Sequence, residues 1–300
     1  MSVTEPGIAA AGEDAAARGA EVTRVLKGVL WLNLSVVALK LVAFVSSQAL
    51  SVVAEAVHSS LDASNNVFAL WIARVATRAP DEDHPYGHAK FETLGALVLV
   101  GFLSITVFEL LRRSIGRLIS GELPDARGTP LALVVMVVSI VVGLGVTVWE
   151  ARRGRELGSH ILLADAAHTR SDVLTTAAVL AGLVAIRAGY GQVDPWITIA
   201  VAVIIARTGW QIVRETVPVL VDERAVEPER IQRVAEAVPQ VESCYRIRSR
   251  GRPGQMFAEV TIAVAGELDV KRSHEIADEV ERRADPALGA HEVVVHVEPA

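Results

Sequence analysis

Six long apolar stretches occupy the first two thirds of this 300-residue chain. The hydrocarbon core of a bilayer is about 30 Å thick, so a helix needs roughly 20 apolar residues to cross it. Six buried helices of this length are hard to accommodate in a soluble protein. The sequence therefore predicts an α-helical membrane protein, with six spans at about 26–46, 49–73, 91–117, 130–149, 159–187 and 194–218.

The apolar residues are unevenly distributed, although 51% of the whole chain is hydrophobic. Residues 222–300 have the composition of an ordinary soluble domain, and residues 1–23 are polar and Ala-rich without the apolar core of a signal peptide. We expect a flexible cytoplasmic N-terminus over 1–23, a six-helix membrane domain over 24–218 and a cytoplasmic domain over 219–300.

An even number of spans places both termini on the same side of the membrane. Arginines at the end of the third span oppose a cytoplasmic assignment, but the larger set of basic residues favours it. That set comprises Arg18, Arg24, Lys27, Arg74, Arg78, Lys90, Arg152, Arg153 and Arg155.

Hydrophobic periodicity in the C-terminal part predicts a small α+β domain of ferredoxin-like type. Amphipathic helices are expected over 227–238 and 270–284, and alternating strands over 241–249, 256–264 and 291–298. The order α-β-β-α-β describes a small open sheet backed by helices. About 75 residues make a marginal core, so we expect this domain to dimerise.

Charge and cysteine content exclude several classes of protein. A net charge of −6 argues against a generally basic nucleic-acid binder. The single cysteine, Cys244, excludes a disulfide framework and a four-cysteine zinc site. No phosphate loop or nucleotide fingerprint is present, which argues against an ATP-driven pump.

The same polar pattern occurs in the second and fifth predicted spans. Residues 54–62 and 164–172 both read Ala-acid-Ala-x-His-x-x-x-Asp. His and Asp four residues apart share one helix face, and ionisable groups in hydrocarbon mark functional sites. Two imidazoles and two carboxylates suit tetrahedral Zn²⁺, although imidazole also suits other transition ions. The candidate ligands are His58, Asp62, His168 and Asp172; the alternative is that they only hydrogen-bond within the bundle.

Polar neighbours accompany both motifs. Glu55 and Asp165 precede each histidine by three residues, and they either orient the imidazoles through hydrogen bonds or face water at the mouth of a cavity. Asn65 and Asn66 follow Asp62 by one turn, and they either line the same cavity or pack between helices. We favour packing.

Two further candidate metal sites lie outside the spans. The loop over 76–90 contains Asp81, His84 and His88 among prolines and a glycine, an arrangement that suits transient metal capture; the alternative is a hydrated acidic loop. In the C-terminal domain the candidates are Cys244, His274, His296 and Glu298, with ordinary exposed polar residues as the alternative.

Taken together, the HSSLD and HTRSD motifs, the DEDHPYGHAK loop and the tail ending HVEP resemble the cation diffusion facilitator family, whose members are proton-coupled divalent-metal exporters. The resemblance covers residues 24–299. It implies a transport site at the four span residues, a cytoplasmic site in the loop, and an ionic interlock between Lys90 and Asp222. It also implies a homodimer formed through the C-terminal domain and the membrane helices, in a plasma membrane of bacterial inner-membrane type.

The two His/Asp pairs resemble the zinc-preferring branch of the family, so Zn²⁺ is the expected substrate, with Cd²⁺, Co²⁺, Fe²⁺ and Mn²⁺ left open. The chain lacks the histidine-rich insertion of many members between the fourth and fifth spans. Cys244, Thr261 and Glu298 stand where the family more often has His, His and Asp. Whether the tail binds two ions, one or none is therefore open.

The expected mechanism is export of the metal in exchange for protons by alternating access. Metal and protons compete for the same imidazole and carboxylate atoms, and an unperturbed imidazole titrates near pH 6.5.

Two other functions use the same residues. The spacings Glu55-x-x-His58 and Asp165-x-x-His168 match the pattern of di-iron carboxylate bundles, which also need further carboxylates such as Glu109. The third interpretation is a metal sensor that binds ions without moving them.

Overall fold

The computed structural model describes the backbone of residues 6–47, 50–121, 130–188, 190–252, 255–288 and 290–300. Within that backbone, side chains are described except at 6–16, 39–40, 42–47, 50–62, 130–132, 183, 187, 191, 252, 255, 285–287 and 290–291. The chain divides into two compact units. We call Gly19–Thr216 the membrane unit, and we call Val217–Ala300 the C-terminal unit.

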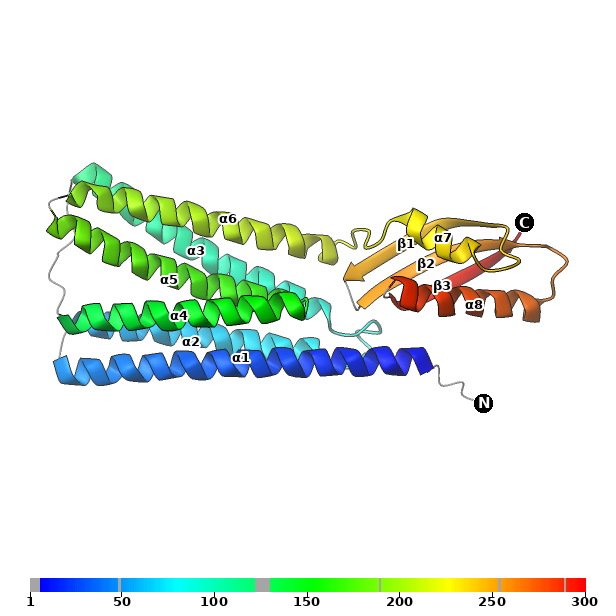
Figure 1. The fold of residues 1–300 in the computed structure, drawn as a ribbon, viewed down its shortest axis with the longest axis horizontal. Helices are drawn as coiled ribbons and strands as arrows, with labels where there is room; N and C mark the ends of the chain where they lie inside the picture. The colour runs from blue at the N-terminus through cyan, green and yellow to red at the C-terminus, as the bar shows by residue number, and fades with distance from the viewer. Residues whose placement is uncertain (1–5, 48–49, 122–129, 189, 253–254, 289) are drawn as a thin grey trace. The chain divides into compact units, whose positions relative to one another are not determined.

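Long helices form the membrane unit, and Figure 1 shows them running side by side. They are α1 (Pro6–Ser47), α2 (Leu50–Ala76), α3 (Lys90–Ser120), α4 (Pro130–Glu156), α5 (His160–Arg187) and α6 (Asp194–Leu220), with a short 3₁₀ turn, η1 (Gly191–Val193), before α6. The helical bundle predicted from the apolar stretches is confirmed.

Within the residues that the structure describes, four helices are long and apolar enough to cross a membrane: Lys90–Ser120, Leu133–Glu156, His160–Ile186 and Asp194–Leu220. They correspond to the third to sixth predicted spans. The first and second predicted spans are helical as well, but α1 and α2 both contain residues outside the description, so the count of six spans stays a prediction.

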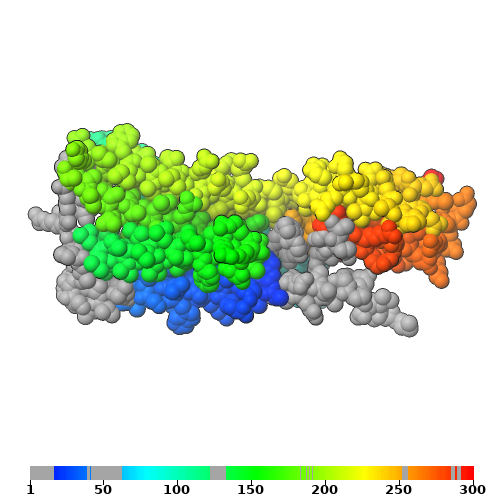
Figure 2. Space-filling view, viewed as in Figure 1, coloured from blue at the N-terminus to red at the C-terminus, as the bar shows by residue number. Residues whose placement is uncertain are grey.

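Apolar side chains cover the outside of the bundle. Figure 2 shows α4 on the visible surface of the membrane unit, and its valines Val137, Val141 and Val148 are exposed. Ile105 and Phe108 of α3 are exposed too. Apolar patches of this extent are unusual on soluble monomers and suit contact with lipid.

The first helix is longer than its apolar stretch. It begins at Pro6, so the backbone of residues 6–23 is helical, while the flexibility expected of residues 1–23 stays a prediction. Proline is favourable in the first turn of a helix, and the alanines that follow have the highest helix propensity. The apolar stretch marked only the part of α1 that suits hydrocarbon.

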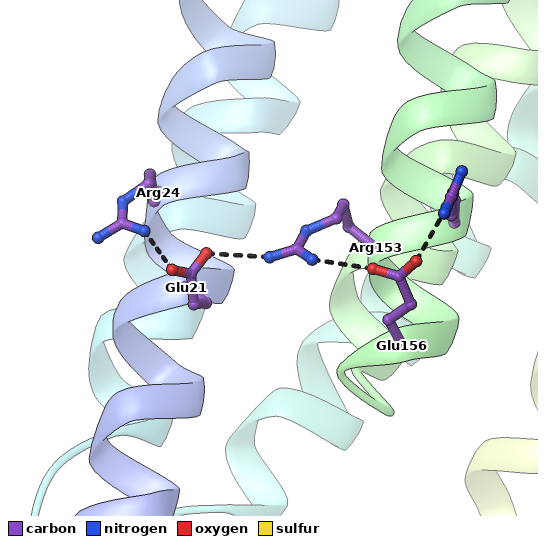
Figure 3. Close-up of polar contacts among 5 residues, drawn as sticks. Glu21, Arg24, Arg153 and Glu156 are labelled. Carbon is purple, nitrogen blue, oxygen red and sulfur yellow. Dashed lines mark hydrogen bonds and ion pairs between the residues drawn. The ribbon is translucent and has the colours of Figure 1, made fainter.

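A chain of charged side chains joins α1 to α4 (Figure 3). Arg153 of α4 donates to Glu21 of α1 at 3.1 Å and to Glu156 at 2.8 Å, while Glu21 also pairs with Arg24. Arg152 completes the chain by donating to Glu156 at 2.9 Å. These groups are partly exposed, so each pair contributes at most about 1 kcal/mol. Together they join the last turn of α4 to the side of α1.

The C-terminal unit has the predicted α-β-β-α-β order. It consists of α7 (Pro228–Glu236), β1 (Ser243–Arg252), β2 (Gln255–Val264), α8 (Val270–Leu288) and β3 (Ala290–Pro299). The strand order is β1-β2-β3, with β1 and β2 antiparallel and β2 and β3 parallel. A parallel pair needs a crossover connection, and α8 provides it.

Both helices of this unit pack against one face of its sheet. Ile231 of α7 and Val280 of α8 share a buried core with Ile262 of β2. Figure 1 shows α7 and α8 alongside the strands. The opposite face of the sheet carries polar side chains. Candidate metal ligands on the strands of this unit can therefore meet only if they lie on the same face.

Candidate metal centre

The loop between α2 and α3 folds around one carboxylate. Asp81 accepts a hydrogen bond from the backbone N–H of His84 at 2.7 Å, and the carbonyl of His84 accepts from the N–H of Gly87 at 2.9 Å. Gly87 has φ +81°, a left-handed conformation that glycine adopts without strain. These turns bring His88, next to the start of α3, back toward Asp81.

Three potential ligand atoms meet in this loop. His84 Nδ1 lies 3.1 Å from Asp81 Oδ1, and His88 Nε2 lies 3.2 Å from Asp81 Oδ2. One ligand atom from each residue lies within 4.8 Å of the others. Ligands on a tetrahedral Zn²⁺ with bonds of about 2.0–2.1 Å are roughly 3.3 Å apart, so small side-chain movements suffice to hold an ion.

The surroundings of Asp81 and His88 favour the binding of a cation. The hydrogen bond from the His84 N–H, followed by the nearby His84 and His88 side chains, lowers the pKa of Asp81 and keeps its carboxylate ionised. His88 is buried against Phe91, with ring centroids 5.6 Å apart, and its Nδ1 has no hydrogen-bond partner among the described residues. Asp81 itself is open to solvent, so an ion has access.

The fifth helix carries one half of the predicted intramembrane site. Ser159 caps α5, where its hydroxyl accepts from the Leu162 N–H and donates to Glu92 of α3. Two turns further on, His168 is 7% exposed and its Nε2 lies 3.8 Å from Asp172 Oδ2. The four-residue spacing therefore places the imidazole and the carboxylate on one face, as expected for a helix.

Two asparagines of α2 meet this half-site. Asn65 Nδ2 lies 2.8 Å from His168 Nε2, and Asn66 donates to Asp165 Oδ2 at 2.8 Å. Asn66 also accepts from Asn33 of α1 at 2.5 Å. Asn66 is packed between helices, as we favoured, and it also bonds the carboxylate that precedes the His168 motif.

The other half of the intramembrane site lies outside the described side chains. His58, Asp62 and Glu55 all lie on α2, whose backbone is helical there. Positions 58, 62 and 66 follow at four-residue spacing, which places them along one stripe of the helix. Whether the four predicted ligands meet stays a prediction.

Sequence reasoning missed the contacts of two polar residues of this region, the half-buried Asn33 and the buried Glu150. Asn33 of α1 bonds Asn66, and Glu150 of α4 is completely buried beside Asp165. The available signal was a polar side chain within or near the end of an apolar helix, because such groups need a partner in hydrocarbon. Neither residue belongs to a repeated motif.

The predicted interlock stays a prediction. Lys90 starts α3 in the membrane unit, whereas Asp222 follows α6 in the C-terminal unit. Within its own unit Asp222 lies 3.5 Å from Arg250.

The C-terminal candidates do not converge within one chain. Cys244 pairs with Ile262 in the sheet, and His296 pairs with Thr261 one residue away, so Cys244 and His296 point to opposite faces. Cys244 is buried in the core, and this burial raises its pKa to about 11, which disfavours the thiolate that binds metal. His274 is exposed on α8 and lies 3.6 Å from Asp278.

Two of these candidates do share a face. His296 Nε2 lies 3.6 Å from Glu298 Oε1. Glu298 accepts from the Tyr245 hydroxyl at 2.6 Å and from Arg246 at 3.0 Å, and chiefly the bond from Tyr245 lowers the pKa of Glu298. Among the residues whose side chains are described, only Asp81, His84 and His88 form a group of three or more potential metal ligands.

Comparison with known proteins decides the family. A model of the cation efflux transmembrane domain matches residues 26–221, and a model of the cytoplasmic domain of cation efflux proteins matches residues 224–300. This chain belongs to the cation efflux family. The resemblance inferred from the histidine and aspartate motifs is confirmed.

Relatives of this cation efflux protein come from distant organisms. It is 28% identical to an uncharacterized transporter of Methanocaldococcus jannaschii, over 83% of this chain and 88% of the relative. It is 28% identical to the cation-efflux pump FieF of Shewanella oneidensis, over 89% and 90% of the two chains. It is 26% identical to the manganese efflux system protein MneS of Bacillus subtilis, over 90% and 92%.

A solved structure titled "MamM-CTD 215-293" is 27% identical to this chain, covering 24% of it and 92% of the solved chain, with a TM-score of 0.23.

Membership of the cation efflux family makes this chain an integral membrane protein that transports metal cations. The di-iron oxidase interpretation of the same residues is therefore not supported. Of the three relatives, only the one from Bacillus subtilis has a name that states a metal, so the substrate of this chain has to be argued from its ligands.

Proposed function

We propose that this transporter exports Zn²⁺ from the cytoplasm in exchange for protons, with His58, Asp62, His168 and Asp172 as the transport site. The observation that carries the proposal is the contact of the buried His168 with the partly buried Asp172 on α5, met by Asn65 of α2. An imidazole and a carboxylate on a membrane helix are costly unless they bind something. The same motif on the partner helix supplies the missing two ligands.

The ligand types favour zinc over manganese. Two imidazoles and two carboxylates suit Zn²⁺, whereas Mn²⁺ prefers sites richer in oxygen. One relative is named a manganese efflux system protein, so Mn²⁺ is the substrate to test against Zn²⁺.

Protons serve as the counter-ion because they compete with the metal for the same atoms. Metal binding requires neutral imidazoles and ionised carboxylates, so protonation on one side of the membrane releases the ion. Before this release, Asp81, His84 and His88 bind the metal from the cytoplasm and pass it to the transport site. This assignment requires both termini and the loop to be cytoplasmic.

The C-terminal unit is the dimerisation domain in this proposal. Its small core favours association with a second copy, and the matching family model describes a cytoplasmic domain of cation efflux proteins. His296 and Glu298 provide two ligands on the open face of the sheet, and a partner copy has to supply the others.

Transport by the purified protein in liposomes tests the proposal. Vesicles with a trapped pH indicator are given Zn²⁺, Mn²⁺, Co²⁺, Cd²⁺ or Fe²⁺, with and without a pH gradient. We expect Zn²⁺ uptake to be fastest, and each uptake to be accompanied by proton movement in the opposite direction. Metal uptake that leaves the trapped pH unchanged would refute exchange, and faster Mn²⁺ uptake would refute the zinc assignment. Binding without any uptake would identify a sensor.

A further inference from the structure

The membrane unit contains a completely buried glutamate. Glu150 lies near the end of α4 and is completely buried. Neither of its carboxylate oxygens has a hydrogen-bond partner among the described residues. Burying an ionised carboxylate without a donor or a cation costs several kcal/mol, so a group in this position binds a cation or a proton.

The charged group that faces Glu150 in the described part of the chain is another carboxylate. Asp165 of α5 is also completely buried and lies within hydrogen-bonding range of Glu150. Two ionised carboxylates offer only acceptors, so this contact becomes a hydrogen bond only when one of the two carries a proton. Like charges this close cannot both persist in a buried site.

The arginine nearest to Glu150 in the sequence does not neutralise it. Arg153 lies one turn beyond Glu150, but its guanidinium donates to Glu21 and Glu156 instead (Figure 3). Among the described side chains of α2, the one that bonds Asp165 is the uncharged Asn66. Within the described part of the chain, a proton is thus the ligand left for Glu150.

We propose that Glu150 and Asp165 form a proton-binding site of this transporter, separate from the metal ligands, in which the two carboxyl groups share one proton. Asp165 already accepts from Asn66, so Asp165 is the ionised partner and Glu150 carries the proton. Glu150 Oε–H donates to Asp165, and loss of the proton leaves two facing carboxylates. This inference rests on the proposed metal/proton exchange only for its role in transport.

Adjacent residues connect the carboxyl pair to the metal site. Asp165 lies one turn before His168 on α5, and their partners Asn66 and Asn65 are consecutive on α2. A movement of α2 relative to α5 that breaks the Asn65 contact with His168 therefore also disturbs the Asn66 bond to Asp165. Loss of that bond destabilises the ionised form of Asp165. The arrangement of α2 and α5 is therefore coupled to the protonation of the carboxyl pair.

Infrared spectroscopy of the full-length protein in lipid tests for the shared proton, because a protonated carboxylic acid has a C=O band that carboxylates lack. We expect the wild-type spectrum to contain such a band that is lost in Glu150→Gln. Glu215→Gln, at an exposed glutamate of α6, is the matched control and should keep the band. Asp165→Asn should keep the band at a shifted frequency, because Glu150 stays buried and protonated with a different acceptor. An unchanged band in Glu150→Gln would overturn the site.

Counting protons in the liposome assay tests its role in transport. Glu150→Gln should bind Zn²⁺ with unchanged affinity but exchange about one proton fewer per metal ion, with a flatter dependence of rate on pH. If the band disappears while the proton count and pH profile stay those of wild type, the proton is permanent and the coupling is refuted. If wild type shows the band but no proton exchange, the proposed function fails while the carboxyl pair stands.

Discussion

The membrane unit and the C-terminal unit both contain candidate histidine ligands, but His168 of the membrane unit is buried whereas the histidines of the C-terminal unit are exposed. His168 is 7% exposed and has an aspartate and an asparagine beside it, whereas His274 and His296 are 79% and 68% exposed in their side chains. In water an imidazole or a carboxylate needs no protein partner; in a buried helix bundle each one does. A buried histidine or carboxylate of the membrane unit therefore needs a partner, whereas the exposed ones of the C-terminal unit do not.

The largest expected effect of a substitution is at His168 and Asp172. His168→Ala and Asp172→Ala should each reduce Zn²⁺ uptake in liposomes to background, because each removes one of four ligands. Loss of a residue that only hydrogen-bonds a metal ligand typically costs about 10–100-fold in metal affinity, so loss of a ligand itself should cost at least as much.

His160→Ala is the matched control, since it removes a histidine from the first turn of the same helix. It should retain uptake. Full uptake by either of the two ligand variants would show that His168 and Asp172 have a structural role.

A close contact at the other end of α5 should give the largest loss of stability. A Cβ at Gly182 would lie 1.9 Å from Asp194 Oδ1, and Asp194 is buried in an ion pair with Arg117 at 2.8 Å. Gly182→Ala should lower the free energy of unfolding by roughly 1–3 kcal/mol, seen as a lower Tm.

Gly101→Ala provides the comparison, because nothing lies within 4 Å of a Cβ there. In a helix interior alanine is favoured over glycine by about 1 kcal/mol, so this variant should be as stable as wild type or more so. Equal Tm values for the two alanine variants would contradict a tight Asp194 contact.

The loop site should affect metal capture more than maximal rate. Asp81→Ala should raise the Zn²⁺ concentration for half-maximal uptake by at least about tenfold, since the carboxylate joins both imidazoles. Asp83→Ala changes an aspartate of the same loop outside the cluster and should leave that concentration unchanged. A lower maximal rate with unchanged half-saturation would contradict capture by the loop.

The pH dependence of binding at the loop follows from the lowered pKa of Asp81. A carboxylate with a lowered pKa stays ionised as the pH falls and is protonated only when the pH passes through that lowered value. The contribution of Asp81 to Zn²⁺ binding at the loop should therefore stay constant as the pH falls and be lost only when the pH passes through the lowered pKa of Asp81. Equilibrium binding between pH 8 and pH 5, compared for wild type and Asp81→Ala, measures this.

The smallest effect is expected in the core of the C-terminal unit. Cys244→Ala should leave metal binding unchanged and cost about 1 kcal/mol of stability, because the thiol is buried on the face opposite His296. Loss of metal binding in this variant, measured by equilibrium dialysis, would show that Cys244 reaches a site across the dimer.

Local patterns in the sequence determined much of this protein. The α-β-β-α-β order, the apolar helices and the pairing of His168 with Asp172 all follow from periodicities of 3.6 and 2 residues, which depend only on neighbours in the chain. The clustering of Asp81, His84 and His88 was also readable, because proline and glycine limit how so short a loop can turn.

Tertiary structure alone decided which distant polar groups meet. The hydrogen-bonded series Asn33, Asn66 and Asp165, with Glu150 beside it, joins four helices whose mutual rotation no local pattern specifies. Strand register, set by the packing of α7 and α8 on one face, separated Cys244 from His296. The physical reason is the same in both cases: side-chain direction along one element is local, but the partner it faces depends on how whole elements pack.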